Sequence, residues 1–496
     1  MLTTLAAPAF ADIWHIENGD ITISAGESGN NVTQNNNTTY GDTNTIITNQ
    51  NKDTASSHTV TIEAKDKDDK VEVTLKDVNI DTSSRNKAAV SVTGEGDTNI
   101  KLDGDNALKS DIYRSGIYGS GSLTISGGEN DSLTAQGGSG ADGIYSSGSL
   151  TISGGTVTAN GDDGGRGISS SGSVTISGGS TVTANGGSGT ISGGDGITSN
   201  GGVTISGGST VTANGGNGGS LVGGSGISNG GSLTVSDGTV TAKGGNGDSK
   251  DGYGGDGIRS GGVVTISGNT VNAAGGYGGK VGGYGICSFD RVAISGGTVE
   301  AAGGNGSTGG GSGIYSSVID LSGSLELTAK AGSPNGKALS QKGSELVLDT
   351  IKDKLGPGAK VTATDADGKV IDQVSTPRPV EPEESSSSSD GGSAAPSAPA
   401  SPLPGLTVTD KDGQRISYTS TQSGNTLTVC VGRLTASLHV SLAALRQLRA
   451  EGIETIAFQT ILCSTSLSVD ELLTMGGEDA EAVLTHRFTD SSLTVG

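Results

Sequence analysis

One short sequence recurs along the middle of the chain about every 28 residues, and this repeat limits the fold more than any other feature. GSLTISGG stands at 121–128 and again at 148–155, and close variants follow it. Alignment of the repeats gives eight coils, 24 to 31 residues apart, with five apolar columns. In the first coil the columns begin at Ile117, Leu123, Ile125, Leu133 and Ala135. The first column is isoleucine throughout: Ile117, Ile144, Ile168, Ile197, Ile227, Ile258, Ile286 and Ile314.

Each coil contains three short segments in which apolar and polar residues alternate, namely Gly-Ile-x-Ser, Leu-Thr-Ile and Val-Thr-Ala. Alternation with a period of two indicates β-strands with one buried face. A column that keeps one residue type through eight coils is explained if its side chains stack at the spacing of paired strands, about 4.8 Å. Parallel crossovers are right-handed by default. The sequence therefore predicts an all-β fold, a right-handed parallel β-helix with three short strands per coil.

The core of such a helix must be aliphatic, because only 3% of the residues are aromatic. Each buried Ile, Val or Leu contributes roughly 1.5–3 kcal/mol, which offsets the entropy cost of the many glycines. Gly-Gly and Asn-Gly pairs between the segments are expected to supply turns with positive φ. Coil length varies mostly between the alanine column and the next Gly-Ile. One corner should therefore carry variable loops, where binding sites commonly lie.

Composition divides the rest of the chain into further segments. Residues 1–11 end in the small-x-small pattern of a signal-peptide cleavage site and are interpreted as a signal-peptide remnant. Residues 12–112 hold more alternating segments and are expected to form diverged coils and a cap, because solenoid ends are atypical. Regular coils and a C-terminal cap are assigned to 113–375. A linker rich in Pro and Ser is assigned to 376–405.

Residues 406–496 have the pattern of a small α+β domain. Strand-like segments precede and follow a helix predicted over 441–452, which Gly452 should end. A second helix is predicted over 468–475, with Ser468 as its N-cap. The pattern indicates a separate domain but does not indicate its role.

Net charge and cysteine content exclude several classes of function. The chain has 30 Lys and Arg against 52 Asp and Glu, a net charge of −22, which argues against binding of nucleic acid or of anionic membranes. It has no apolar run long enough for a transmembrane helix. Three cysteines are too few for a disulfide scaffold or a Cys-rich metal site. Cys430 and Cys463 could pair if the chain is exported, which leaves Cys287 in an outward-facing column. Such a composition suits a bacterial extracellular protein, secreted or associated with the cell surface, and we expect a monomer.

Residues 12–345 resemble the clostridial-type secreted right-handed β-helix proteins that bind carbohydrate and have a shape like that of pectate lyases. The segments that carry the resemblance are VEVTLKDVNIDT (71–82), AAVSVTGEGDTNIKLDGDNAL (88–108) and GIYGSGSLTISGG (116–128). The resemblance implies a parallel β-helix and binding of plant-wall glycans such as cellulose or pectin. The sequence contains no site motif of the family, so the resemblance assigns no binding residue.

The acidic residues of the regular coils do not form a catalytic pattern. Hydrolases with this fold need a close pair of carboxylates, and lyases need a basic residue beside Ca²⁺-binding acids. Asp142, Asp195 and Asp256 share the position before Gly-Ile but never in adjacent coils, so they stand about 10 Å apart, too far to hold one ion together. The sequence favours a non-catalytic protein without a cofactor. A polysaccharide lyase or hydrolase is a further alternative.

Tyrosines supply the candidate carbohydrate-binding residues. Tyr118 and Tyr145 occupy one outward column in adjacent coils, with Tyr315 further along. Their rings could form a platform for sugars, whose C–H faces pack on aromatic rings, or could simply pack across strands. Three more tyrosines lie in Gly-rich loops of successive coils, as a recognition patch or as loop anchors: Tyr253, Tyr277 and Tyr284.

Two further patterns indicate other ligands. GGSGADGIY at 137–145 matches the Ca²⁺-binding nonapeptide GGxGxDxUx with Asp142 as the ligand, although the tandem repetition of that motif is absent. Thr-x-Thr pairs stack in four consecutive coils and resemble the ice-binding faces of some antifreeze proteins, or form an ordinary strand surface. The pairs are Thr156/Thr158, Thr181/Thr183, Thr210/Thr212 and Thr239/Thr241.

Three functions stay open at this point. The preferred one is non-catalytic binding of a polysaccharide outside the cell by a β-helix surface. The net charge disfavours anionic pectin unless Ca²⁺ bridges the charges, whereas neutral glucans escape that penalty. The second is a structural adhesin or spacer that presents its loops and residues 406–496 to a protein partner. The third is ice binding by the threonine face.

Overall fold

The computed structural model describes residues 12–377 and 405–495, the latter with gaps at 411–414, 417, 424, 432–434, 461–463, 476–479 and 488–489. The chain divides into two compact units, Met1–Pro382 and Glu383–Gly496. The predicted signal-peptide remnant and most of the predicted linker lie outside the described residues.

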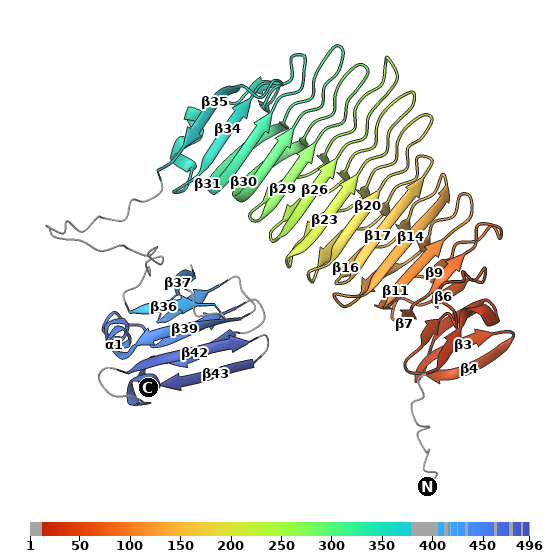
Figure 1. Ribbon diagram of the computed structural model, residues 1–496, viewed down its shortest axis with the longest axis horizontal. Coiled ribbons are helices and arrows are strands. Elements are labelled where there is room, and N and C mark those ends of the chain that lie inside the picture. Colours follow the sequence, from red (N-terminus) through yellow and green to blue (C-terminus); the bar gives the residue numbers. More distant parts are fainter. Residues whose placement is uncertain are drawn as a thin grey trace, which may run out of the picture. The chain divides into compact units, whose positions relative to one another are not determined.

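The first unit is a right-handed parallel β-helix of about 13 turns with ~28 residues per turn, as the repeat predicts (Figure 1). Its strands form one continuous 35-stranded sheet that winds around the aliphatic core. The predicted columns stack in register: Ile144 pairs with Ile117 and with Ile168, and Val157 pairs with Leu133 and with Val182. The side chains of these columns are buried, so the aliphatic residues that define the repeat also form the core.

The strands of the β-helix fall into three stacks, which we call sheets 1, 2 and 3. Sheet 1, built from the Gly-Ile segments, contains β2 (Ile21–Gly26), β6 (Val60–Ala64), β9 (Val90–Gly94), β12 (Ile117–Gly119), β15 (Ile144–Ser146), β18 (Ile168–Ser170), β21 (Ile197–Ser199), β24 (Ile227–Asn229), β27 (Ile258–Ser260), the starts of β30 (Ile286–Ala302) and β31 (Ile314–Lys330), and β32 (Leu339–Gln341). Sheet 2 contains β1 (Ile13–His15), β5 (Ile46–Thr48), β7 (Lys70–Lys76), β10 (Asp97–Asp103), β13 (Ser122–Ser126), β16 (Leu150–Ser153), β19 (Val174–Ser177), β22 (Val203–Ile205), β25 (Leu233–Val235), β28 (Val264–Ile266) and the middles of β30 and β31. Sheet 3 contains β8 (Asn79–Asp81), β11 (Asp105–Lys109), β14 (Ser132–Ser139), β17 (Thr156–Asp162), β20 (Thr181–Asn185), β23 (Ser209–Asn214), β26 (Gly238–Lys243), β29 (Thr270–Ala274), the ends of β30 and β31, and β34 (Lys360–Thr364).

Antiparallel segments cap both ends of the β-helix. At the N-terminal end, after the short η1 (Ile16–Asn18), β2 pairs antiparallel with β3 (Gly29–Gln34), which pairs with β4 (Asn37–Asp42). At the C-terminal end, β32 pairs antiparallel with β33 (Ser344–Glu345), and β34 pairs antiparallel with β35 (Val370–Ser375). The short helix η2 (Leu348–Lys354) lies in the same cap. The sequence predicts diverged coils and a cap over 12–112, and residues 29–42 form an antiparallel hairpin that covers the end of the first coil.

The glycines of the coils serve two purposes, and only one of them was predicted. In the Ser-Gly-Gly turns at 153–155, 177–179 and 206–208 both glycines have positive φ, for example +91° at Gly154 and +72° at Gly155. The corner predicted to hold variable loops instead carries ordered arms, which we call the glycine arms: 186–196, 215–226, 244–257, 275–285 and 303–313 (Figure 1). None of their glycines has positive φ. Each arm runs out and back, and its backbone amides bond to the arms of the neighbouring coils at about 2.8 Å, as from Gly216 to Gly194. A Cβ on Gly224 would overlap the carbonyl oxygen of Gly194, so this close approach of backbones requires glycine.

The second unit has the α+β fold that its sequence predicts. One four-stranded sheet contains β36 (Leu406–Thr409), β39 (Thr435–Ser441), β42 (Glu481–Arg487) and β43 (Asp490–Val495), and the other contains β37 (Thr419–Ser423), β38 (Thr426–Cys430), β40 (Thr455–Gln459) and β41 (Ser464–Ser468). The helices are α1 (Leu442–Ala450) and α2 (Val469–Met475). Ser441 caps α1 by accepting a hydrogen bond from the amide of Ala444, and Gly452 follows with φ +89°. Cys430 is a free thiol that contacts Gln459, and its predicted partner Cys463 lies outside the described residues.

Candidate functional site

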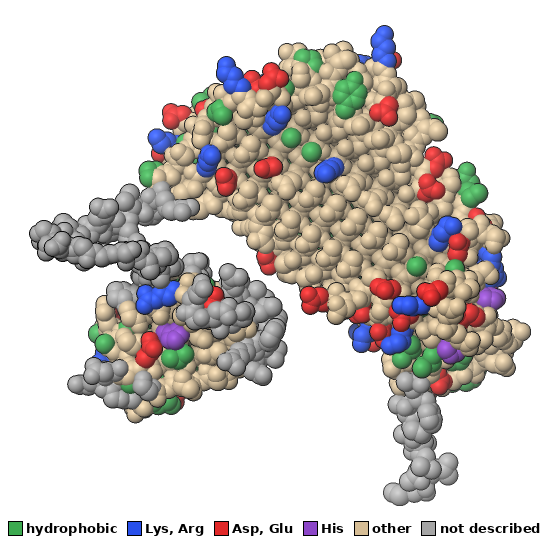
Figure 2. Space-filling model, viewed as in Figure 1, with side chains coloured by type: hydrophobic (Ala, Val, Ile, Leu, Met, Phe, Trp, Pro, Cys, Tyr) green, Lys and Arg blue, Asp and Glu red, His purple; other side chains and the backbone are tan. Residues whose placement is uncertain are grey.

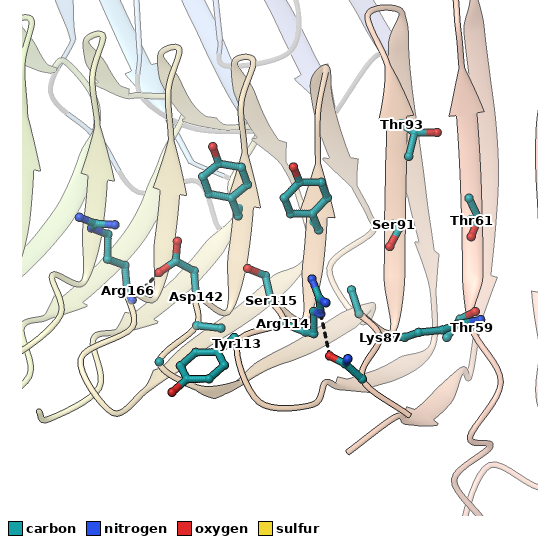
Figure 3. Close-up of a pocket in the computed structure, with 16 residues that line it drawn as sticks. Thr59, Thr61, Lys87, Ser91, Thr93, Tyr113, Arg114, Ser115, Asp142 and Arg166 are labelled. Carbon is teal, nitrogen blue, oxygen red and sulfur yellow. Dashed lines mark hydrogen bonds between the residues drawn. The ribbon is translucent and has the colours of Figure 1, made fainter. Parts of the chain in front are cut away.

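A groove of about 620 Å³ lies along the outer surface of sheet 1 in the N-terminal coils (Figure 3). Its floor is the outward column of β6, β9, β12 and β15. One wall comes from the segments that lead into these strands. Figure 3 shows charged wall residues in a row across successive coils, from Arg166 through Asp142 and Arg114 to Lys87. The floor column consists of Thr61, Ser91, Tyr118 and Tyr145.

The two tyrosines of the floor form a nearly parallel pair. Tyr118 and Tyr145 are register partners in adjacent coils, and their ring centroids lie 5.4 Å apart at an interplanar angle of 15°. Alternation along each strand turns them outward, because the residues on either side point into the core. Their neighbours in the column are the small Ser91 and Ser169, so the rings rise above the rest of the floor.

Two arginines of the groove wall form no ion pair with any described carboxylate. Within residues 12–377, Arg85, Arg259 and Arg291 each pair with an aspartate. Arg114 and Arg166 form no ion pair with a described carboxylate, although acids outnumber bases in the chain. Arg114 donates instead to the side-chain oxygen of Asn86, at 3.3 Å. The lining thus concentrates positive charge in a molecule that is negative overall.

A cluster of charges around Asp20 fixes the N-terminal edge of the groove. Arg85 donates to both carboxylate oxygens of Asp20 at 2.7 and 3.1 Å, and Lys87 and His58 lie 3.0 and 3.2 Å from them. Burial alone would raise the pKa of Asp20, but these contacts and the amide of Thr59 outweigh it and hold the pKa well below its usual range. Lys87 is thereby neutralised in part. Arg114 and Arg166 are then the cations of the described groove lining that form no ion pair, although the charge of Arg166 also acts to lower the pKa of Asp142.

Asp142 has a structural partner in the next coil. Its Oδ1 accepts a hydrogen bond of 2.7 Å from the amide of Arg166, and burial raises the pKa of its carboxyl. Asp195 and Asp256 stand at the same position of their coils and accept from the amides of Ser225 and Tyr284 at 2.6 and 2.7 Å. Aspartate before Gly-Ile therefore holds the following coil in place.

The groove offers little for hydrolysis or metal binding. Asp142 is the only acidic side chain among the described residues that line it, whereas glycoside hydrolysis uses two carboxylates. Nowhere in the described parts of the chain do three His, Cys, Asp or Glu side chains come together as metal ligands. Calcium at Asp142 stays a prediction, and this residue would supply it with one carboxylate.

The remaining candidate tyrosines lie in two other places. The ring of Tyr284, which the sequence predicts to lie with Tyr253 and Tyr277 in a recognition patch or as a loop anchor, stacks on that of Tyr315, with centroids 4.9 Å apart. Tyr253 and Tyr277 lie on the glycine arms and are 44% and 49% exposed. Other exposed apolar side chains of the arms are Ile191, Leu221 and Val222. These arms are the surface that an adhesin would present, and the five predicted tyrosines do not form one site.

Cys287 differs from its predicted environment. It does occupy the outward column of sheet 1, between Arg259 and Tyr315, but its side chain is buried. Burial raises the pKa of this thiol to about 12, so it stays protonated and unreactive near neutral pH.

Sequence reasoning missed the residues of the groove wall: Lys87, Tyr113, Arg114 and Arg166. The only available signal was position, because Tyr113 and Arg114 shortly precede Gly116-Ile117 and Arg166 directly precedes Gly167-Ile168. No helix in the described parts of the chain is long and apolar enough to cross a membrane.

Comparisons of the chain with protein-family models, with curated proteins and with solved structures give no match. A function must therefore be argued from the groove itself.

Proposed function

We propose that the protein binds a polysaccharide in the groove of sheet 1, without catalysis and outside the cell. The observation that carries the proposal is the parallel pair of Tyr118 and Tyr145 beside two unpaired arginines. The rings provide apolar surface for the C–H faces of sugars, and their hydroxyls provide hydrogen bonds. Small side chains around the rings leave room for a chain of sugars on the floor of the groove.

The arginines favour an acidic glycan. A guanidinium group offers a planar fork of donors that matches a carboxylate, and bonds between charged partners are about twice as strong as neutral ones. At physiological ionic strength, charges more than about 8 Å away are largely screened. The local positive charge of Arg114 and Arg166 therefore counts for more than the net charge of −22. This revises the expectation that an anionic glycan such as pectate would need Ca²⁺ as a bridge.

Retention on insoluble polysaccharides tests the proposal. We expect the full chain to be retained on pectate, with and without a chelator, and more weakly on cellulose. The double variant Arg114→Gln/Arg166→Gln should lose most of the retention on pectate, because the groove then lacks its unpaired cations. Arg291→Gln is the matched control, since Arg291 lies outside the groove lining and already faces Asp320.

The outcomes separate the alternatives. Retention on pectate that disappears with chelator would favour bridging by Ca²⁺ over direct contact with the arginines. Retention of the double variant equal to that of the control would contradict the assignment of the arginines. Failure of the native chain to bind any polysaccharide would contradict the proposed function.

A second candidate function, ice binding, is favoured by the outer face of sheet 3. The predicted threonine pairs are confirmed in register from β17 to β26, and the side chains of Asn160, Asn185 and Asn214 continue the pattern as a ladder of hydrogen bonds of 2.8 Å. Figure 2 shows few charged or hydrophobic side chains in the middle of the face over these strands. The face therefore presents hydroxyl and amide groups at regular strand spacings.

Thermal hysteresis tests ice binding. We expect it in the native chain and expect Thr183→Leu and Thr212→Leu to abolish it, because the larger side chains interrupt the array. Thr175→Leu on sheet 2 is the control. Absence of hysteresis in the native chain would contradict this function.

A further inference from the structure

A second pair of tyrosines lies on the same sheet as the groove, nearer the C-terminal end of the β-helix. Tyr315 belongs to the outward column of sheet 1 that holds Tyr118 and Tyr145, and Tyr284 stacks on it at an interplanar angle of 20°. The register of successive strands places Tyr315 six coils beyond Tyr145. At about 4.8 Å per coil, this separation is roughly 29 Å.

Most side chains of the column between the two tyrosine pairs are short. Arg259 is its one long side chain in the described structure, and two contacts hold it in place: its Nη1 lies 3.1 Å from Asp256, and its guanidinium lies 5.0 Å from the centre of the Phe289 ring. The other four side chains of the column are small. In order, the column reads Ser169, Thr198, Ser228, Arg259 and Cys287.

The acids beside this column already have hydrogen-bond partners. Asp195 accepts from the amide of Ser225 and, at 2.9 Å, from the hydroxyl of Thr198. Asp256 is buried and accepts from the amide of Tyr284 and from Arg259. These carboxylates are therefore partly compensated. The column between the pairs carries mostly small side chains, of which Ser169 and Cys287 are buried, and it has an aromatic pair at each end.

We propose that one unbranched polysaccharide chain lies along this column, parallel to the axis of the β-helix, and contacts both tyrosine pairs at once. This inference rests on the proposed function of the groove and adds Tyr284 and Tyr315 as a second binding site for the same chain. Once one pair holds the chain, binding at the other is intramolecular, so the affinity rises without any new kind of contact. The ligand class is thus a long linear glycan rather than a mono- or disaccharide.

The dependence of affinity on chain length tests this inference. Isothermal titration calorimetry would use the full chain with oligogalacturonates, from the disaccharide to lengths well beyond the 29 Å span. We expect a step in affinity of roughly 100-fold once the oligosaccharide reaches across both pairs. Tyr315→Ser should weaken the binding of long oligosaccharides by about tenfold and leave short ones unchanged, whereas Tyr145→Ser should weaken both.

Serine is the chosen replacement because it already stands in this column at Ser169 and Ser340, so the variants should fold; thermal unfolding confirms this. Tyr40→Ser is the control, since Tyr40 is 76% exposed on β4 and lies outside the column. The same series with cello-oligosaccharides covers neutral glycans. Binding that shows no step with length, or no effect of Tyr315→Ser, would overturn this inference. The proposal that the groove of sheet 1 binds a polysaccharide would not be affected. Absence of binding in both series would overturn the proposed function as well.

Discussion

At the scale of single residues, the outward column of sheet 1 shows which side chains the fold needs and which it does not. Serine occupies this column in the coils of β9, β18, β24 and β32, where strand pairing is as regular as elsewhere. Tyrosine at 118, 145 and 315 is therefore not required by packing. A large aromatic side chain that the fold does not need is better explained by a partner.

His486 gives the second unit a dependence on pH. It is buried against the ring of Phe458, its nitrogens face the hydroxyls of Thr460 and Thr465, and burial lowers its pKa. The unfolded chain, with a His pKa of about 6.5, then binds protons more readily than the folded chain. Stability from this group is complete above pH 6.5 and is lost as the pH falls toward the lower folded pKa.

Hydrogen exchange of β42 measures this effect. We expect protection of β42 in the full chain to decrease from pH 7 to pH 5, after correction for the intrinsic exchange rate. The variant His486→Gln should show a smaller change, because glutamine does not titrate. Protection that falls equally in both proteins would mean that another group is responsible.

At the scale of elements, the glycine arms depend on the absence of side chains. A Cβ on Gly311 would overlap the carbonyl oxygen of Gly283 in the neighbouring arm, and backbone cannot move aside as a flexible side chain can. Gly309, in the same arm, faces only the methyl groups of Val281 at 3.8 Å, which is an ordinary contact, and it has no positive φ. The two positions form a matched pair.

Thermal unfolding of Gly311→Ala and Gly309→Ala tests this account of the arms. We expect Gly311→Ala to destabilise the β-helix by about 3 kcal/mol or more, because the stacked backbones must separate. Gly309→Ala should be neutral or stabilising by about 0.4–1 kcal/mol, because alanine reduces the entropy of the unfolded chain. Equal effects of the two substitutions would show that the arms are loosely packed.

The arms also show how far the sequence can predict this structure. The five apolar columns identify the β-helix and its register, because each column stays aliphatic in all eight coils and sits between mostly polar neighbours. The first column is isoleucine throughout and the fifth is alanine throughout. Runs of glycine contain no such pattern, so the sequence predicts only loops in this part of each coil. In the structure, hydrogen bonds between backbones stack these segments as ordered arms. The hairpin over 29–42 is missed for a similar reason: half of its strand residues are Asn or Thr, and Val32 and Tyr40 are its only hydrophobic strand residues, so no apolar alternation marks the strands.

The groove could be predicted only in part. Tyr118 and Tyr145 belong to the repeat, so the alignment places them side by side. The cationic wall does not belong to it, because Lys87, Arg114 and Arg166 occur in different contexts in three separate coils. Whether an arginine has an acidic partner depends on contacts between coils, and no spacing along the chain reveals that.

At the scale of the whole β-helix, stability is approximately a sum of the contributions of the coils and of the contacts between neighbouring coils. The two end coils have a neighbour on one side only, so an uncovered end can associate with another chain. The C-terminal cap, residues 339–375, pairs with β31 and covers the last apolar columns with buried residues such as Leu348 and Val361. Without it, β31 would expose a strand edge of 17 residues and the apolar end of the core. Open edges of this kind pair with other chains.

Two truncations test the role of this cap. A chain that ends at Lys330 lacks the cap, and we expect it to self-associate, because the coil of β31 offers the next chain the same pairing that it gives β32 and β34. A chain that ends at 377 keeps the cap and lacks only the linker and the second unit, so it should stay monomeric. Size-exclusion chromatography with light scattering distinguishes the two at equal concentration. If both truncated chains are monomeric, the end of the β-helix must be protected by its terminal coil alone; if both associate, the described cap is not sufficient.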